Sequence, residues 1–227
     1  MRPRSLSLSV VLALAVTGLV IAAKDEKPKA TKYDSPEAVY KAAAAAAKKN
    51  DMKAFAGCLA DESLEAMAGG MAIGGAMMVK FADAFDKTGK AKEKMKPITA
   101  VLKKHGITDD VVEKAMKNFP KESKDPKEQV KALRGLAKSI KDKAAFLGEY
   151  MAAMKKVDEK QGNAPELGKL EDVKKDGDKA TANATFKQGG KEQKVKLEFV
   201  KEGGSWKMIL PMPGPGKGGE APAPKDK

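Results

Sequence analysis

The spacing of apolar residues changes once along the chain. Up to about residue 161 they recur every three or four positions, as on a helix face, and afterwards they alternate with polar residues, as in a half-buried strand. Helices first and strands last predict an α+β fold, because the helices must cover one face of the sheet. We expect N-terminal helices packed on a C-terminal antiparallel four-stranded meander, with a helical insertion between them.

Short helices are predicted for residues 35–65. Ser35 supplies an N-cap hydroxyl, Pro36 occupies the first helical position and Glu37 lies in the first turn, so a helix begins here. It contains six consecutive alanines and ends near residue 50, and Asp61 caps a later helix. We assign these helices to an α+β core.

An uncharged stretch follows at residues 66–79, with four glycines. The spacing Gly70-x-x-x-Gly74 is typical of close helix–helix contacts in membranes. Fourteen residues are too few to cross a bilayer, which needs about 20, and charged residues follow from position 80. We interpret the stretch as a buried helix whose glycines admit a neighbouring backbone, with an apolar stripe that continues to Phe85.

The rest of the predicted insertion, which spans residues 66–161, is also helical. Lys96-Pro97 is expected to open one helix, and His105-Gly106 to end it. A heptad seam then predicts a helix of about 30 residues, roughly 45 Å long. The preceding helices in an antiparallel hairpin, or a second copy of the chain, could cover the seam, and we prefer the hairpin because alanines and internal glycines weaken a dimer seam. The seam residues are Val130, Leu133, Ala137, Ile140, Ala144, Leu147, Met151 and Met154.

The strands of the meander are predicted within residues 162–210. Turns are expected at Asp176-Gly177-Asp178, at Gly189-Gly190 and at Gly203-Gly204. One face of the sheet is apolar and includes three alternating alanines, which together with the alanine-rich first helix suggest a close helix–sheet approach. These alanines are Ala180, Ala182 and Ala184.

Both ends of this arrangement resemble exported bacterial members of the nuclear-transport-factor-2-like superfamily, many of which are domains of unknown function. The opening match runs from Ser35 to Phe55, and the closing match runs from Asp176 through the Gly-Gly hairpins to Lys207. The resemblance implies a cone, in which a curved sheet wraps around helices and leaves a pocket at its open end. The helical stretch from about residue 66 to 161 departs from the family, which has a short connection there.

The chain ends outside this core are predicted to be a leader and a tail. A basic start, an apolar run and small residues at positions 22 and 23 predict a signal peptide over residues 1–23. An uncleaved membrane anchor is the alternative, but the densest apolar stretch is shorter than the ~20 residues of a span. We therefore expect a secreted or periplasmic protein, with a flexible lead at 24–34 and a disordered Pro/Gly tail at 211–227.

Composition makes the expected core thin. After residue 23, Leu, Ile, Val and Phe provide 32 of 204 residues, so 11 Met and 32 Ala must fill much of the interior. The formal charge of +13 comes from 41 lysines and only three arginines. Because arginine is the residue favoured for phosphate and base contacts, and no aromatic platform lies among the lysines, we expect no specific nucleic-acid partner.

Catalytic and metal-binding patterns are not found in the sequence. His105 stands alone at a helix end, acids such as Asp109-Asp110 suit the first turn of a helix, and the single Cys58 is expected to be a buried apolar residue. No catalytic residue, metal or cofactor is therefore predicted. The residues expected to face the cone, as ligand-binding candidates, are Tyr40, Ala182, Phe186, Leu197 and Trp206.

These observations favour an exported, non-enzymatic binding or accessory module for a small apolar ligand or a protein partner, with no stable membrane span after processing. The first alternative is a lysine-based electrostatic binder of anionic polymer or cell-surface material. The second alternative, implied by the resemblance, is an isomerase-like or dehydratase-like enzyme with an acid or Tyr at the mouth of the cone.

Overall fold

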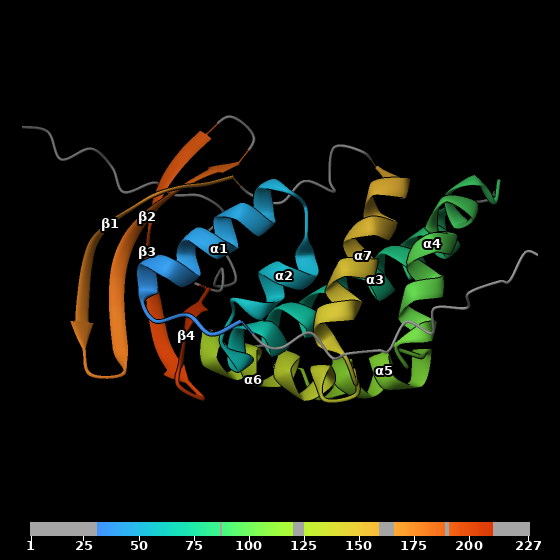
Figure 1. The fold of residues 1–227 in the computed structure, drawn as a ribbon. Helices are drawn as coiled ribbons and strands as arrows, with labels where there is room; N and C mark the ends of the chain where they lie inside the picture. Colours follow the sequence, from blue (N-terminus) through green and yellow to red (C-terminus); the bar gives the residue numbers. More distant parts are fainter. Residues whose placement is uncertain (1–30, 87, 120–124, 159–165, 189–190, 211–227) are drawn as a thin grey trace, which may run out of the picture. The chain divides into compact units, whose positions relative to one another are not determined.

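The computed structural model describes residues 31–86, 88–119, 125–158, 166–188 and 191–210 (Figure 1). These residues belong to one compact unit. The predicted signal peptide, the predicted tail and the predicted turn at residues 189–190 lie outside them.

The described part of the chain contains seven helices followed by four strands, which confirms the predicted α+β class (Figure 1). The helices are α1 (Pro36–Lys48), α2 (Met52–Gly57), α3 (Asp61–Phe85), α4 (Lys90–Lys104), α5 (Asp109–Lys117), α6 (Pro126–Ala137) and α7 (Lys143–Val157). The strands are β1 (Glu166–Asp176), β2 (Lys179–Gln188), β3 (Lys191–Glu202) and β4 (Ser205–Ile209).

The sheet is the predicted antiparallel meander, with the order β1-β2-β3-β4. Gly177 has a φ of 55°, and Gly203 and Gly204 have φ values of 56° and 77°, so two of the predicted turns use a backbone conformation that glycine adopts at low cost. The pairing of β1 with β2 shifts register twice along β1. Asp172, which lies at the second shift, has a φ of 55°. β1 is therefore an irregular outer strand.

The other outer strand, β4, is covered by segments from the N-terminal part of the chain. Met208 N donates to Cys58 O, and Ala60 N donates to Met208 O, both at 2.9 Å. Trp206 N donates to Tyr33 O at 2.9 Å, and Tyr33 N donates to the Ser205 hydroxyl at 2.9 Å. Tyr33 therefore belongs to the core, and not to a flexible lead as predicted, because its backbone extends the pairing of β4.

A first hydrophobic cluster lies between α1, α2 and the sheet. Both outer strands, β1 and β4, contact α1, so the sheet bends around this helix (Figure 1). The three predicted alanines of β2 are buried in this cluster together with alanines of α1. Small side chains on both elements allow the helix and the sheet to pack closely.

A second hydrophobic cluster is formed mainly by the five helices from α3 through α7. Its fully buried large side chains include Ile98, Ile140, Phe146 and Leu147. Partly buried Leu64 and Met67 of α3 pack against both clusters. The predicted boundary between residues 65 and 66 thus falls inside one continuous helix, α3.

The uncharged stretch of α3 packs as predicted, although through other glycines. A Cβ atom on Gly69 would lie 2.0 Å from the carbonyl oxygen of Leu133 in α6, and one on Gly75 would lie 2.7 Å from the Tyr150 ring of α7. Gly74, by contrast, has no such neighbour within 4 Å. No helix of the described residues is long and apolar enough to cross a membrane.

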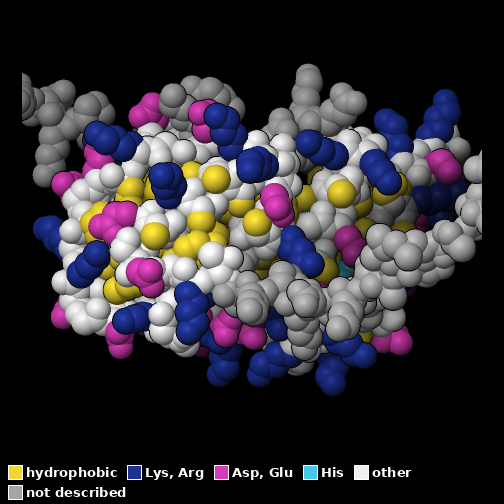
Figure 2. Space-filling model, in the orientation of Figure 1, with side chains coloured by type: hydrophobic (Ala, Val, Ile, Leu, Met, Phe, Trp, Pro, Cys, Tyr) yellow, Lys and Arg dark blue, Asp and Glu magenta, His cyan; other side chains and the backbone are white. Residues whose placement is uncertain are grey.

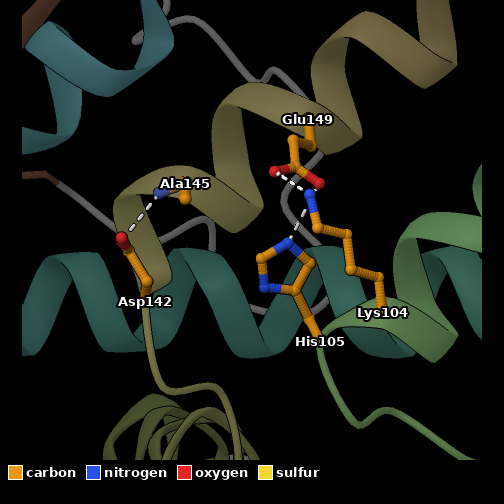
Figure 3. Close-up of polar contacts among 5 residues, drawn as sticks. All are labelled: Lys104, His105, Asp142, Ala145 and Glu149. Carbon is orange, nitrogen blue, oxygen red and sulfur yellow. Dashed lines mark hydrogen bonds and ion pairs between the residues drawn. The ribbon is translucent and has the colours of Figure 1, made fainter. Parts of the chain in front are cut away.

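The prediction of one helix across the heptad seam is wrong, because the chain turns between α6 and α7. Ser139 donates its hydroxyl to Leu136 O at 2.7 Å, and the Asp142 carboxylate accepts from Ala145 N at 2.9 Å and caps α7 (Figure 3). Ile140 lies in this turn and is nevertheless buried. Preceding helices cover both halves of the seam: α6 contacts α3 and α5, and α7 contacts α2, α3 and α4.

The predicted start of α4 at Lys96-Pro97 is also wrong, whereas its end is confirmed. α4 begins at Lys90 and contains Pro97 in its interior. The Asp86 carboxylate accepts hydrogen bonds from Thr88 and from Ala91 N, so it satisfies the first helical turn well before the proline. The helix ends at His105-Gly106, where Gly106 has a φ of 79°.

Candidate functional site

The five residues predicted to face a cone lie together in the first hydrophobic cluster. Tyr40, Ala182, Leu197 and Trp206 are buried there, and Phe186 is half-buried against them. The Tyr40 hydroxyl donates to the carbonyl oxygen of Gly168 in β1 at 3.1 Å, and burial raises the pKa of Tyr40. None of the five lines any of the three hollows described below.

Exposed large apolar side chains gather instead on the helical part of the chain. Among the described residues, the exposed fractions are 38% for Met77, 55% for Phe81, 78% for Phe85 and 36% for Met116. All four line one groove between α3 and α5, with a volume of about 540 Å³. This volume is within the usual range for small-molecule sites, roughly 300–1,000 Å³.

Helical spacing builds both walls of the groove. Met77, Phe81 and Phe85 follow one another at intervals of four along the last turns of α3, so they share one face. The Phe81 and Phe85 rings stack with centroids 5.9 Å apart. On α5, Val112 and Met116 are also four residues apart, and Val112 is only 2% exposed, so it forms the floor.

Charged side chains stand along the rim of this apolar groove. Lys80 comes from α3, and Glu113 and Lys117 come from α5. Lys80 Nζ lies 3.9 Å from Glu113 Oε1, which is a loose, exposed ion pair. The groove therefore combines an apolar interior with a rim of two cations and one anion.

Two further hollows border the groove. One of about 460 Å³ shares Phe85 and is lined by Lys90 and Lys94 of α4. The other, of about 1260 Å³, lies among α3, α4 and α5 and has many charged residues of both signs in its lining. No group of three or more metal-ligating side chains that could hold an ion occurs among the described residues.

The sequence indicated an isolated His105, but in the structure its side chain pairs with a residue of another helix (Figure 3). Its Nε2 lies 3.2 Å from Glu149 Oε2 of α7, and Lys104 Nζ donates to Glu149 Oε1 at 2.7 Å. The Lys104 hydrogen bond, followed by that of His105, lowers the pKa of Glu149. A carboxylate held ionised in this way is a poor general base, and it ties the end of α4 to α7.

Cys58 is buried, as predicted for a thiol without a disulfide partner. Its sulfur lies 3.5 Å from both the Tyr33 hydroxyl and the Ala54 carbonyl oxygen. Burial raises the pKa of Cys58, and burial together with the contact to Cys58 raises the pKa of Tyr33 to about 12. The thiol therefore stays protonated and is a poor nucleophile.

The carboxylates that the sequence places in pairs lie at helix starts. Asp61-Glu62 open α3 and Asp109-Asp110 open α5, where negative charge is favoured by the helix dipole. Glu62 also lies 3.8 Å from Arg134 Nη1, so this acid takes part in an ion pair between helices.

The groove was not predicted, although its apolar stripe on α3 is visible in the sequence. A stripe at helical spacing shows which face of a helix is apolar, and most such faces are covered in the fold. Nothing in the order of the elements along the chain indicates that α5 packs beside this face of α3 without covering it. Comparison with protein-family models, with curated protein sequences and with solved structures finds no match to this chain.

Proposed function

We propose that the chain is an exported, non-enzymatic binding module that takes an apolar group into the groove between α3 and α5. The observation that carries this proposal is that the four exposed large apolar side chains among the described residues all line this groove. Covering apolar surface stabilises by about 25 cal/mol per Å², and contiguous exposed apolar patches mark interaction sites. Methionine in the lining lets the groove adapt to its ligand.

The chemistry of the groove supports binding over catalysis. Among the described residues that line it, the ionisable side chains are Lys80, Glu113 and Lys117, all on the rim. General acid–base catalysis relies on groups whose pKa lies near neutrality, and the described groove places no histidine, cysteine or tyrosine against its apolar interior.

The distribution of charge gives the electrostatic alternative less support. Figure 2 shows Lys and Arg side chains scattered over the visible face, with acidic side chains between them. Several lysines pair with acids, for example Lys92 with Asp83 at 3.5 Å and Lys175 with Glu37 at 3.5 Å. Interspersed charges keep a thin-cored protein soluble and provide few simultaneous contacts to a polyanion.

The first hydrophobic cluster supports a second, structural proposal, namely that α1, α2 and the sheet form a nuclear-transport-factor-2-like cone. A sheet whose two outer strands both contact one helix has the curvature of such a cone. In this proposal Tyr40 and Trp206 fill the interior, and the ligand site has moved to the helical part of the chain.

A neutral apolar dye, N-phenyl-1-naphthylamine, tests the location of the site. We expect saturable fluorescence enhancement that Phe81→Ser weakens roughly tenfold, because a buried phenyl group contributes about 1.5–3 kcal/mol. The matched control is Phe186→Ser, which alters the predicted cone and should leave dye affinity unchanged. If Phe186→Ser weakens binding and Phe81→Ser does not, the site is in the cone and the groove proposal is wrong.

Export is tested separately by the intact mass of the protein released from a bacterial host. We expect a chain that has lost about the first 23 residues, because the charge pattern around the apolar run is that of a signal peptide. A released protein that retains Met1 would contradict this part of the proposal.

A further inference from the structure

We infer that the ligand of the α3–α5 groove is a free anionic amphiphile, a single long apolar chain that ends in a carboxylate. This inference rests on the proposed function and adds the chemical class of the ligand. It comes from the charges around the α3 wall of the groove. We call the exposed apolar face that Met77, Phe81 and Phe85 form on this wall the ridge.

Three acids that lie near this ridge already form ion pairs or hydrogen bonds within the protein. Glu113 pairs with Lys80 at 3.9 Å, and Asp83 pairs with Lys92 at 3.5 Å. Asp86 accepts hydrogen bonds from the Thr88 hydroxyl and from backbone N–H groups at the start of α4, which lower its pKa. These carboxylates therefore have partners within the protein.

Three lysines around the same ridge have no ion-pair partner among the described residues. Lys117 stands on the rim of the groove, and Lys90 and Lys94 line the hollow on the other side of Phe85. None of the ion pairs found among the described residues includes any of these three lysines. An apolar chain lying along the ridge would thus have one such ammonium group beside the groove and two beside the hollow that shares Phe85.

The shape of the site favours a free amphiphile over the surface of a bilayer. Val112 forms a buried floor between two helices, so the apolar residues enclose a concave space of about 540 Å³. A bilayer would contact a protruding surface and leave this space unfilled. Phe85 also borders the second hollow, of about 460 Å³, so a long chain can continue past its ring.

Calorimetric titration of the intact chain with three probes of equal chain length tests the inference: dodecanoate, dodecanol and dodecylammonium, each below its aggregation concentration. We expect dodecanoate to bind roughly threefold to tenfold more tightly than dodecanol, since an exposed ion pair contributes about 0.2–1 kcal/mol and more than one lysine can take part. Dodecylammonium should bind most weakly.

Variants assign the preference to the rim. Lys117→Met keeps an apolar stem of similar length and removes the charge, so it should lower the ratio of dodecanoate affinity to dodecanol affinity. Lys174→Met, an exposed lysine on β1 away from the groove residues, is the matched control and should change neither affinity.

The outcomes separate this inference from the proposed function. If all three probes bind equally and Phe81→Ser weakens them all, the groove binds apolar groups but the anionic preference is wrong. If no probe binds, both proposals fail. If free dodecanoate does not bind but anionic phosphatidylglycerol vesicles do, and Phe81→Ser abolishes that binding, the partner is a bilayer and the inference is overturned.

Discussion

Gly69 marks the closest approach between helices in the second hydrophobic cluster. The contact that a Cβ atom would make there is with backbone, at 2.0 Å from Leu133 O, so no side-chain rotation can relieve it. α6 would have to move away from α3 to admit even one methyl group.

We therefore expect Gly69→Ala to lower the free energy of unfolding by about 1–3 kcal/mol or more, as for other overpacked interiors. Gly74→Ala is the matched control in the same helix, because its Cβ would meet nothing within 4 Å. Alanine is the better helix former, so this control should raise stability by about 0.5–1 kcal/mol. Urea unfolding measures both, and equal effects of the two substitutions would show that the crossing is looser than described.

Glu149 gives the fold a defined dependence on pH. The hydrogen bonds from Lys104 and His105 lower its pKa from an ordinary value of 4.5, so the folded state favours the ionised form. Its contribution to stability is complete above pH 4.5 and is lost as pH falls through the lowered folded-state pKa.

We expect Glu149→Gln to cost no more than about 1 kcal/mol above pH 4.5, because the side chain is 36% exposed and solvent screens its ion pairs. The difference between the two proteins should shrink as the pH is lowered further, since the native carboxylate then becomes protonated. Urea unfolding of both proteins over a pH series measures this. A difference that stays constant down to strongly acidic pH would contradict it.

The turn between α6 and α7 shows how local hydrogen bonds override a regular apolar pattern. The seam continues through Ile140, which is buried although it is not helical. The period alone therefore indicates a single helix, whereas Ser139 and Asp142 bind backbone groups and redirect the chain.

Removing the cap at this turn should destabilise the fold without changing the seam. Asp142→Ala is expected to lower the free energy of unfolding by about 0.5–2 kcal/mol, because Ala145 N loses its acceptor. Asp142→Asn retains an oxygen in that position and should cost much less. If both substitutions cost the same, the loss comes from charge and not from the cap.

On the scale of the whole molecule, the two hydrophobic clusters are joined and are not independent. Leu64 and Met67 pack against both clusters, and Met151 of α7 packs against the first. Ser63, at the start of α3, accepts a hydrogen bond from Leu210 N at 3.0 Å. Disruption of one cluster therefore exposes surface of the other.

We expect the two clusters to unfold together. The single tryptophan, Trp206, lies in the first cluster, whereas most of the helix content lies in the second. Tryptophan fluorescence and far-ultraviolet circular dichroism should therefore report the same urea midpoint, and Gly69→Ala should shift both equally. Separate midpoints would show that the predicted division at residues 65 and 66 also divides the stability of the molecule.

Features that depend on neighbouring residues could be predicted from the sequence, and those that depend on distant residues could not. The turns at Gly177 and at Gly203-Gly204 follow from local backbone preference, and they define the meander. His105 and Glu149 are 44 residues apart, so neither identifies the other. The apolar face of α3 was visible as a pattern, but the exposure of Phe81 depends on where α5 packs.

The covering of β4 has a consequence for the behaviour of the protein at high concentration. An uncovered outer strand is a template on which other chains can add strands and aggregate. Here Tyr33 and residues 58–60 already occupy hydrogen-bonding positions along the outer edge of β4. The other outer strand, β1, is long but rich in lysine and acid, and its register shifts twice. The outer edge of β4 is therefore already hydrogen-bonded within the molecule, and the outer edge of β1 is charged and irregular. Both features protect the sheet from the addition of strands from a second molecule.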